Sequence, residues 1–96
     1  MNKIGIDPDL MRTRAREYHK ESEEIAMVIG RLDKLLGKLE SEWDGQASEA
    51  YRQRYVELKK GFVAAQELAE EIGVALTDVA EHYQETDKAV ARAVRG

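Results

Sequence analysis

The sequence of 96 residues contains no cysteine, a single proline and a single tryptophan. Without cysteine there are neither disulfide bonds nor zinc sites built on thiolates, although secretion is not excluded. No apolar run approaches the roughly 20 residues of a membrane-spanning helix. The first residues, MNKIGIDPDL, lack the apolar stretch of a signal peptide. We therefore expect a cytoplasmic protein, or one that is secreted by a route that needs no such peptide.

Basic character and catalytic motifs are also missing. The net charge is −4, whereas nucleic-acid-binding domains are usually basic, so we expect no nucleic-acid partner. His19 and His82 are the only histidines. They are preceded three residues earlier by Arg16 and Val79, so the Glu-x-x-His pairs of a di-iron bundle are absent. No serine–histidine–aspartate order or phosphate-binding loop is found. We expect neither an enzyme nor a metal or cofactor site.

The residues that are present indicate two long helices. Asp7 followed by Pro8 is a strong signal for a helix start. From there a seam with alternating steps of four and three predicts a helix over residues 8 to 40. The seam consists of Met11, Ala15, Tyr18, Ser22, Ile25, Ile29, Leu32, Leu36 and Leu39.

A second seam predicts a helix over residues 46 to 93. Its members are Tyr55, Leu58, Phe62, Ala65, Ala69, Ile72, Leu76, Val79 and Tyr83. Between the helices we expect a turn over residues 41 to 45 with Gly45 as its pivot. The fold class is thus all-α, a single domain over residues 1 to 96 formed by an antiparallel two-helix hairpin.

Four glycines fall inside the helical patterns: Gly30, Gly37, Gly61 and Gly73. Each costs about 1 kcal/mol relative to alanine in a helix. Either they are tolerated defects, or a neighbouring helix approaches closely there. The sequence alone leaves both explanations open.

The apolar stripe is wider than one hairpin can bury, because Val28, Leu35, Val63, Leu68 and Val74 lie beside the seams. Such a surface indicates an interface, and a second hairpin would complete an antiparallel four-helix bundle. The expected core of hairpin and dimer is Ile25, Val28, Ile29, Leu32, Leu36, Leu39, Leu58, Phe62, Ile72 and Leu76. We expect a homodimer in preference to a heterodimer.

The second helix is longer than the first, about 70 Å against about 50 Å at 1.5 Å per residue. Beyond roughly residue 80 we expect no partner within the chain, unless residues 1 to 7 fold alongside the second helix. In an antiparallel dimer the turn of one hairpin lies beside the tail of the other. Trp43 would then lie where the partner's tail arrives.

The chain resembles the WXG family of small secreted proteins, the ESAT-like substrates of type VII secretion. The resemblance rests on Trp43-x-Gly45 between two helices, with Ala47 and Tyr51 at the following small and aromatic positions. Near the C-terminus Tyr83-x-x-x-Asp87 matches the export signal of the family. Two apolar positions of a longer form of that signal are Val90 and Val94.

The resemblance implies export as a folded dimer, either with itself or with a WXG paralogue. The turn of one chain and the tail of the other would form a composite signal for an FtsK/SpoIIIE-type ATPase. It also implies a secreted, virulence-associated factor or a co-secretion partner. Tyr83 alternatively continues the intrachain seam. Rival interpretations are a cytoplasmic helical adaptor and a membrane-active effector, the latter disfavoured by the many outward-facing acids.

Overall fold

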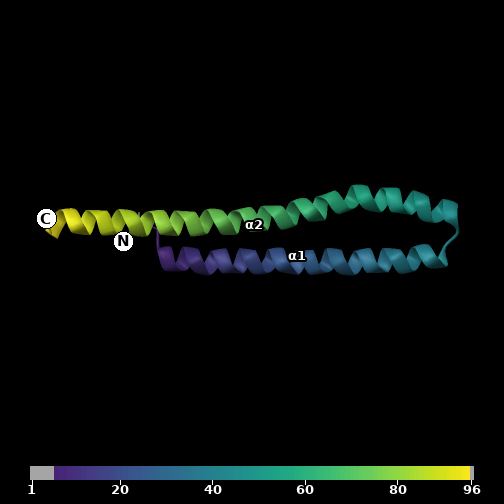
Figure 1. Ribbon diagram of the computed structural model, residues 1–96, viewed down its shortest axis with the longest axis horizontal. Coiled ribbons are helices and arrows are strands. Elements are labelled where there is room, and N and C mark those ends of the chain that lie inside the picture. Colours follow the sequence, from purple (N-terminus) through teal and green to yellow (C-terminus); the bar gives the residue numbers. More distant parts are fainter. Residues whose placement is uncertain (1–5, 96) are drawn as a thin grey trace.

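The computed structural model describes residues 6–95 and consists of two antiparallel helices, α1 (Pro8–Glu42) and α2 (Gly45–Arg95). Figure 1 shows the hairpin, which measures 76 × 26 × 17 Å. The predicted all-α hairpin is confirmed. Within residues 6–95 neither helix has an apolar stretch long enough to cross a membrane.

The N-terminus of α1 is fixed by its capping residue. The Asp7 carboxylate accepts hydrogen bonds from the backbone N–H groups of Asp9 at 3.0 Å and Leu10 at 3.3 Å. Pro8 has no N–H to lose at the first helical position. The helix start therefore lies where the sequence predicted it.

The turn is shorter than predicted and has a different pivot. Ser41 is still helical, and only Trp43 and Asp44 lie between the two helices. Gly45 is the first residue of α2, and its backbone does not adopt the left-handed conformation that favours glycine. The prediction of Gly45 as the pivot was wrong. Instead, the Asp44 carboxylate caps α2 by accepting from the backbone N–H groups of Gln46 at 3.1 Å and Ala47 at 3.2 Å.

Small side chains form the contact between the helices in the half of the hairpin away from the turn. The buried residues of α1 and α2 recur at spacings typical of a helical seam: Ala15, Ser22 and Ile29 on α1, and Ala69, Gly73 and Ala80 on α2. A Cβ atom on Gly73 would lie only 2.8 Å from the His19 ring, so close approach explains this glycine. At Gly30, Gly37 and Gly61 a Cβ atom would meet nothing within 4 Å.

The half next to the turn is packed more openly. Figure 1 shows α2 curving away from α1 there. A cavity of about 300 Å³ opens between the helices, lined by Ile29, Leu32, Tyr51, Tyr55, Leu58, Lys59 and Phe62. Of the expected core residues, Ile29 is buried, and Ile25, Val28, Leu32, Leu36, Ile72 and Leu76 are half-buried. The other three, Leu39, Leu58 and Phe62, are 36%, 56% and 48% exposed in the single hairpin.

The paired part of the hairpin extends further than predicted. Ala80 is completely buried, and Arg12 donates to the side-chain oxygen of Gln84 at 2.6 Å. α2 thus loses its partner in α1 about one helical turn after residue 80, where the sequence analysis placed this point. The protruding tail begins after about residue 84, because small side chains at Gly73 and Ala80 keep the helices together until α1 begins.

Candidate functional site

At the turn end an aromatic pair is exposed. Trp43 has extended backbone angles, φ −118° and ψ 156°, and is 42% exposed. Its ring lies against Tyr51 with the centroids 5.5 Å apart and the planes tilted by 53°. Tyr51 is 46% exposed. Trp43 therefore packs on the first turns of α2 and still presents part of its ring to a partner.

At the opposite end the tail presents an uncovered seam. Tyr83 and Val90 continue, in steps of seven, the row of Ala69, which is buried against α1. Asp87 and Val94 continue in the same way the buried row of Gly73 and Ala80.

Exposure rises along this tail seam. Tyr83 is half-buried and Asp87 is exposed. Val90 is 57% and Val94 81% exposed. Among residues 6–95 no second helix covers this continuation of the packing face of α2.

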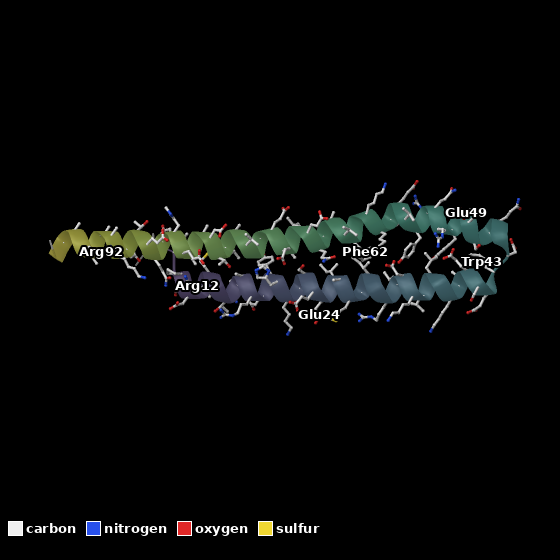
Figure 2. The ribbon with its side chains drawn as sticks, in the orientation of Figure 1. Arg12, Glu24, Trp43, Glu49, Phe62 and Arg92 are labelled. Carbon is white, nitrogen blue, oxygen red and sulfur yellow. The ribbon has the colours of Figure 1, made fainter. Side chains whose placement is uncertain are left out.

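The turn and the tail lie far apart in one chain. Figure 2 shows Trp43 at one end of the hairpin and Arg92 on the tail beyond the start of α1, near Arg12. The structure thus brings Trp43, Gly45 and Tyr51 together, and separately Tyr83, Asp87, Val90 and Val94. It does not bring the two groups together within one molecule.

One side of the hairpin carries polar contacts between the helices. Asp33 accepts from the Tyr55 hydroxyl at 2.7 Å and from the Lys59 ammonium at 2.9 Å. The hydrogen bond from Tyr55, followed by that from Lys59, lowers the pKa of Asp33. Burial, followed by the hydrogen bond to Asp33, raises the pKa of Tyr55 to about 12.

A second polar contact lies nearer the turn. Arg52 donates to Glu40 from Nε at 2.8 Å and from a terminal nitrogen at 3.2 Å. This fork lowers the pKa of Glu40 and raises that of Arg52. The sequence analysis did not identify these pairs. Their signal was the matching seven-residue spacing of Asp33 with Glu40 and of Arg52 with Lys59.

His19 reaches from α1 across to α2, and its side chain remains 35% exposed. Its Nδ1 is 3.0 Å from the Glu70 carboxylate, and its ring covers Gly73. Within residues 6–95 no group of three or more potential metal ligands is present.

These contacts define two sides of the hairpin. Among residues 6–95 the α1 members of the interhelix side-chain hydrogen bonds are Arg12, His19, Asp33 and Glu40, all spaced by multiples of seven. We call this the polar side. The opposite, apolar side contains Tyr18, Ile25, Val28, Leu32, Leu35 and Leu39 of α1 and Leu58, Ala65, Leu68, Ile72 and Val79 of α2.

A long hairpin with an aromatic-x-glycine turn has counterparts among known proteins. The family described as proteins of 100 residues with WXG, WXG100, matches residues 3–88. The chain belongs to this family. Protein YukE of Bacillus subtilis (strain 168) is 31% identical over 93 residues, which cover 97% of this chain and 96% of that protein. Type VII secretion system extracellular protein A of Staphylococcus aureus (strain USA300) is 26% identical, covering 92% and 91%.

Solved structures show the same hairpin. EsxA of Geobacillus thermodenitrificans is 35% identical with a TM-score of 0.77, covering 93% of this chain and 97% of that one. A variant of the secreted protein EsxB of Bacillus anthracis is 25% identical with a TM-score of 0.81, covering 93% and 98%. WXG100 proteins are small helical type VII secretion substrates, not a catalytic family. Dimers that form four-helix bundles are typical of them.

Proposed function

We propose that this protein is exported by a type VII secretion system as a folded dimer. The observation that carries the proposal is the tail of α2, where Tyr83, Asp87, Val90 and Val94 expose the continuation of a packing seam. An apolar stripe with one acid on a protruding helix suits insertion into the groove of a receptor. We propose an FtsK/SpoIIIE-type ATPase as that receptor.

The turn supplies the second half of the signal in this proposal. Trp43 is anchored on Tyr51 and about two-fifths exposed, so it can contact another helix without unfolding the turn. In an antiparallel dimer the tail of one hairpin arrives beside the turn of the other. The composite surface of Trp43 and the partner's tail then exists only in the assembled pair, which restricts export to dimers.

The test is the distribution of the protein between cells and medium, with a cytoplasmic marker for lysis. Asp87→Ala should keep the protein inside cells while the purified variant remains helical and dimeric. Glu85→Ala is the matched control, because this exposed acid lies two residues away on another face of the same tail. Normal export of Asp87→Ala would contradict the proposed tail signal.

The turn is tested separately. Trp43→Arg should block export but leave the helical circular-dichroism signal intact, because the aromatic pair lies outside the buried rows of the hairpin. Tyr51→Ala should have a weaker effect of the same kind, since it removes only the support of the Trp43 ring. Normal export of Trp43→Arg would exclude the turn from the signal.

A further inference from the structure

Two hollows on the polar side form one groove in the half of the hairpin where α2 curves away from α1 (Figure 1). The first has a volume of about 290 Å³ and is lined by Gly37 of α1 and Val56 of α2. The second, of about 340 Å³, continues along α2 from Val56 to Val63. Val56 and Lys59 line both hollows, so the two are contiguous. We call them together the polar groove.

The polar groove lies on the side of the hairpin opposite the apolar side. Asp33 and Glu40, which belong to the polar side, line its first hollow. Val56 is 51% exposed in it, and Val63 is half-buried. A second hairpin packed on the apolar side would therefore leave the polar groove open to a further partner.

Glycines keep the α1 wall of this side low. Gly30 and Gly37 lie three residues before Asp33 and Glu40, so they face the same side of α1. Glycine is unfavourable inside a helix, yet a Cβ atom at either position would meet nothing within 4 Å. Packing within the hairpin therefore does not explain these glycines. Close approach by another helix on the polar side does, because a backbone without side chains admits it.

The charge around the polar groove is opposite in sign to that of the whole chain, which is −4. In residues 30–40 and 52–65 each acid is held in an ion pair: Asp33 with Lys59, Glu40 with Arg52, and Glu57 with Arg54. The other charged residues of these stretches form no ion pair within residues 6–95, and all are basic: Arg31, Lys34, Lys38 and Lys60. This surplus of positive charge favours an acidic partner.

Shape and charge together favour a helix among acidic partners. An elongated groove with an apolar floor suits an amphipathic helix, which inserts residues spaced by three, four and seven. A nucleic acid would bring its phosphates against the Asp33 and Glu40 carboxylates in the first hollow. A flat bilayer surface would not reach the floor at Gly37. Glu67 lines the far end of the second hollow, so the acids of the partner should lie nearer the turn.

We propose that the polar groove binds an acidic amphipathic helix of a partner protein. Small apolar residues of that helix lie over Gly37 and against Val56 and Val63. Its acidic residues meet Lys34 and Lys60, which are exposed on the two sides of the groove. This surface adds a binding site to the proposed export and does not depend on the tail signal.

The test uses a synthetic helical peptide of about 14 residues, which is about 21 Å long. One face carries alanine and leucine and both flanks carry glutamate, and a second peptide has lysine in place of glutamate. NMR titration of the isotope-labelled protein gives the dissociation constant and the contact site. We expect the acidic peptide alone to bind and to shift the amide signals of Gly30 and Gly37. The signal of Gly61, seven residues before Leu68 of the apolar side, should stay in place.

Two variants change the groove without disturbing the hairpin. Gly37→Ala should weaken peptide binding about fivefold or more, because its methyl group fills the floor while the helix becomes more favourable. Gly61→Ala is the matched control and should bind as wild type does.

A double variant tests the charge. Lys34→Glu with Lys60→Glu should weaken binding of the acidic peptide about tenfold or more, and high salt should weaken binding to wild type. Arg16→Glu with Lys20→Glu makes the same charge change at exposed positions away from the groove and should have little effect.

Several outcomes would overturn the inference. Equal binding of both peptides, or no binding of the acidic peptide at millimolar concentration, would exclude an acidic helix. Binding of vesicles that contain anionic lipid, without binding of the peptide, would make a membrane the occupant. Association beyond a dimer that is lost in Val56→Glu would make a further copy of the chain the occupant. None of these outcomes changes the export expected of Asp87→Ala, so the two proposals fail separately.

Discussion

Gly73 shows how a single residue can hold two helices together. The His19 ring occupies the space where a side chain at residue 73 would begin, 2.8 Å from the position of its Cβ atom. From there His19 reaches the Glu70 carboxylate on the preceding turn of α2. Sequence periodicity could not separate this glycine from Gly30 or Gly37, because the difference lies in what the other helix places opposite each.

We predict that Gly30→Ala and Gly37→Ala each raise the free energy of unfolding by about 0.5–1 kcal/mol. Alanine has the better helix propensity, and its Cβ atom meets nothing at either position. Gly73→Ala should gain less, because the His19 ring must move from its place beside Glu70. Urea unfolding followed by circular dichroism, at one protein concentration, measures the differences. An equal gain at Gly73 would contradict this account.

The Tyr55 hydroxyl gives a prediction for high pH. Its pKa in the folded protein is about 12, above the ordinary 10.0, because burial and the bond to Asp33 favour the neutral form. The resulting stabilisation is complete below pH 10 and is lost as the pH rises towards 12. An absorbance titration of tyrosinate should show one of the four tyrosines ionising near pH 12.

Two variants test whether Tyr55 is the tyrosine that ionises near pH 12. Tyr55→Phe should remove it, and Asp33→Asn should move it towards lower pH, because the amide keeps the acceptor oxygen without the charge. The same hydrogen bond shifts the pKa of Asp33 in the opposite direction, below its ordinary value of 3.8. Its contribution to stability is present above that pH and is lost as the pH falls through the lowered pKa. A tyrosine step near pH 12 that survives in Tyr55→Phe would show that another residue causes it.

Among the elements, the 51-residue helix α2 depends on one carboxylate for its start. We predict that Asp44→Ala lowers the free energy of unfolding by about 1 kcal/mol, because two backbone N–H groups lose their acceptor. Asp44→Asn should retain most of the stability. Glu42→Ala, which removes a neighbouring exposed acid, should have little effect in the same urea titration.

The ends of α1 and α2 could be predicted only where they depend on residues that are neighbours in the sequence. Asp7 and Pro8 identify the start of α1 because capping involves only neighbouring residues. The turn was predicted from the conformational freedom of Gly45, yet the chain reverses through Trp43 and the capping residue Asp44. A glycine permits a turn without requiring one, whereas a capping carboxylate determines where the helix begins.

The predicted seam of α2 includes Ala69, which is buried against α1, but it omits Gly73 and Ala80 for a physical reason. Periodicity follows the largest apolar side chains, and these include Leu58 and Val79 on the apolar side. The helices of the hairpin instead bury smaller residues, Gly73 and Ala80, which leave room for close approach. A single sequence cannot tell which of two adjacent rows packs on its own chain and which faces another molecule.

For the whole molecule, the open apolar side is the dominant feature. Among residues 6–95 no large side chain is fully buried in the single hairpin. The single hairpin leaves large apolar side chains partly exposed, and the proposed second hairpin would bury them further. The stability of the hairpin should therefore depend on assembly.

We predict that Leu58→Glu breaks the dimer and lowers the unfolding temperature, whereas Val56→Glu does neither. The two residues are similarly exposed in the hairpin, at 56% and 51%, but only Leu58 lies on the apolar side. Size-exclusion chromatography with light scattering gives the mass of each variant. Loss of the dimer in Val56→Glu alone would place the interface on the opposite side.

The functional residues of the turn and the tail could be predicted from the sequence, but their structural surroundings could not. Trp43 and Tyr83 follow from short patterns, so they could be identified without a structure. That Trp43 rests on Tyr51, and that the tail continues the buried rows of α2, depends on the register of two helices. Register is a property of the packed pair and not of either segment.

The protruding tail also makes the molecule tapered. The whole molecule measures 26 × 17 Å along its two shorter axes, whereas the tail is one helix, about 10–12 Å wide. A passage of about 12 Å would admit the tail as far as the start of α1 near Pro8 and stop there. A passage wider than 26 Å would admit the folded hairpin. Cross-linking α1 to α2 would therefore distinguish the two cases. A cross-linked protein passes only through a channel that is wide enough for the folded hairpin.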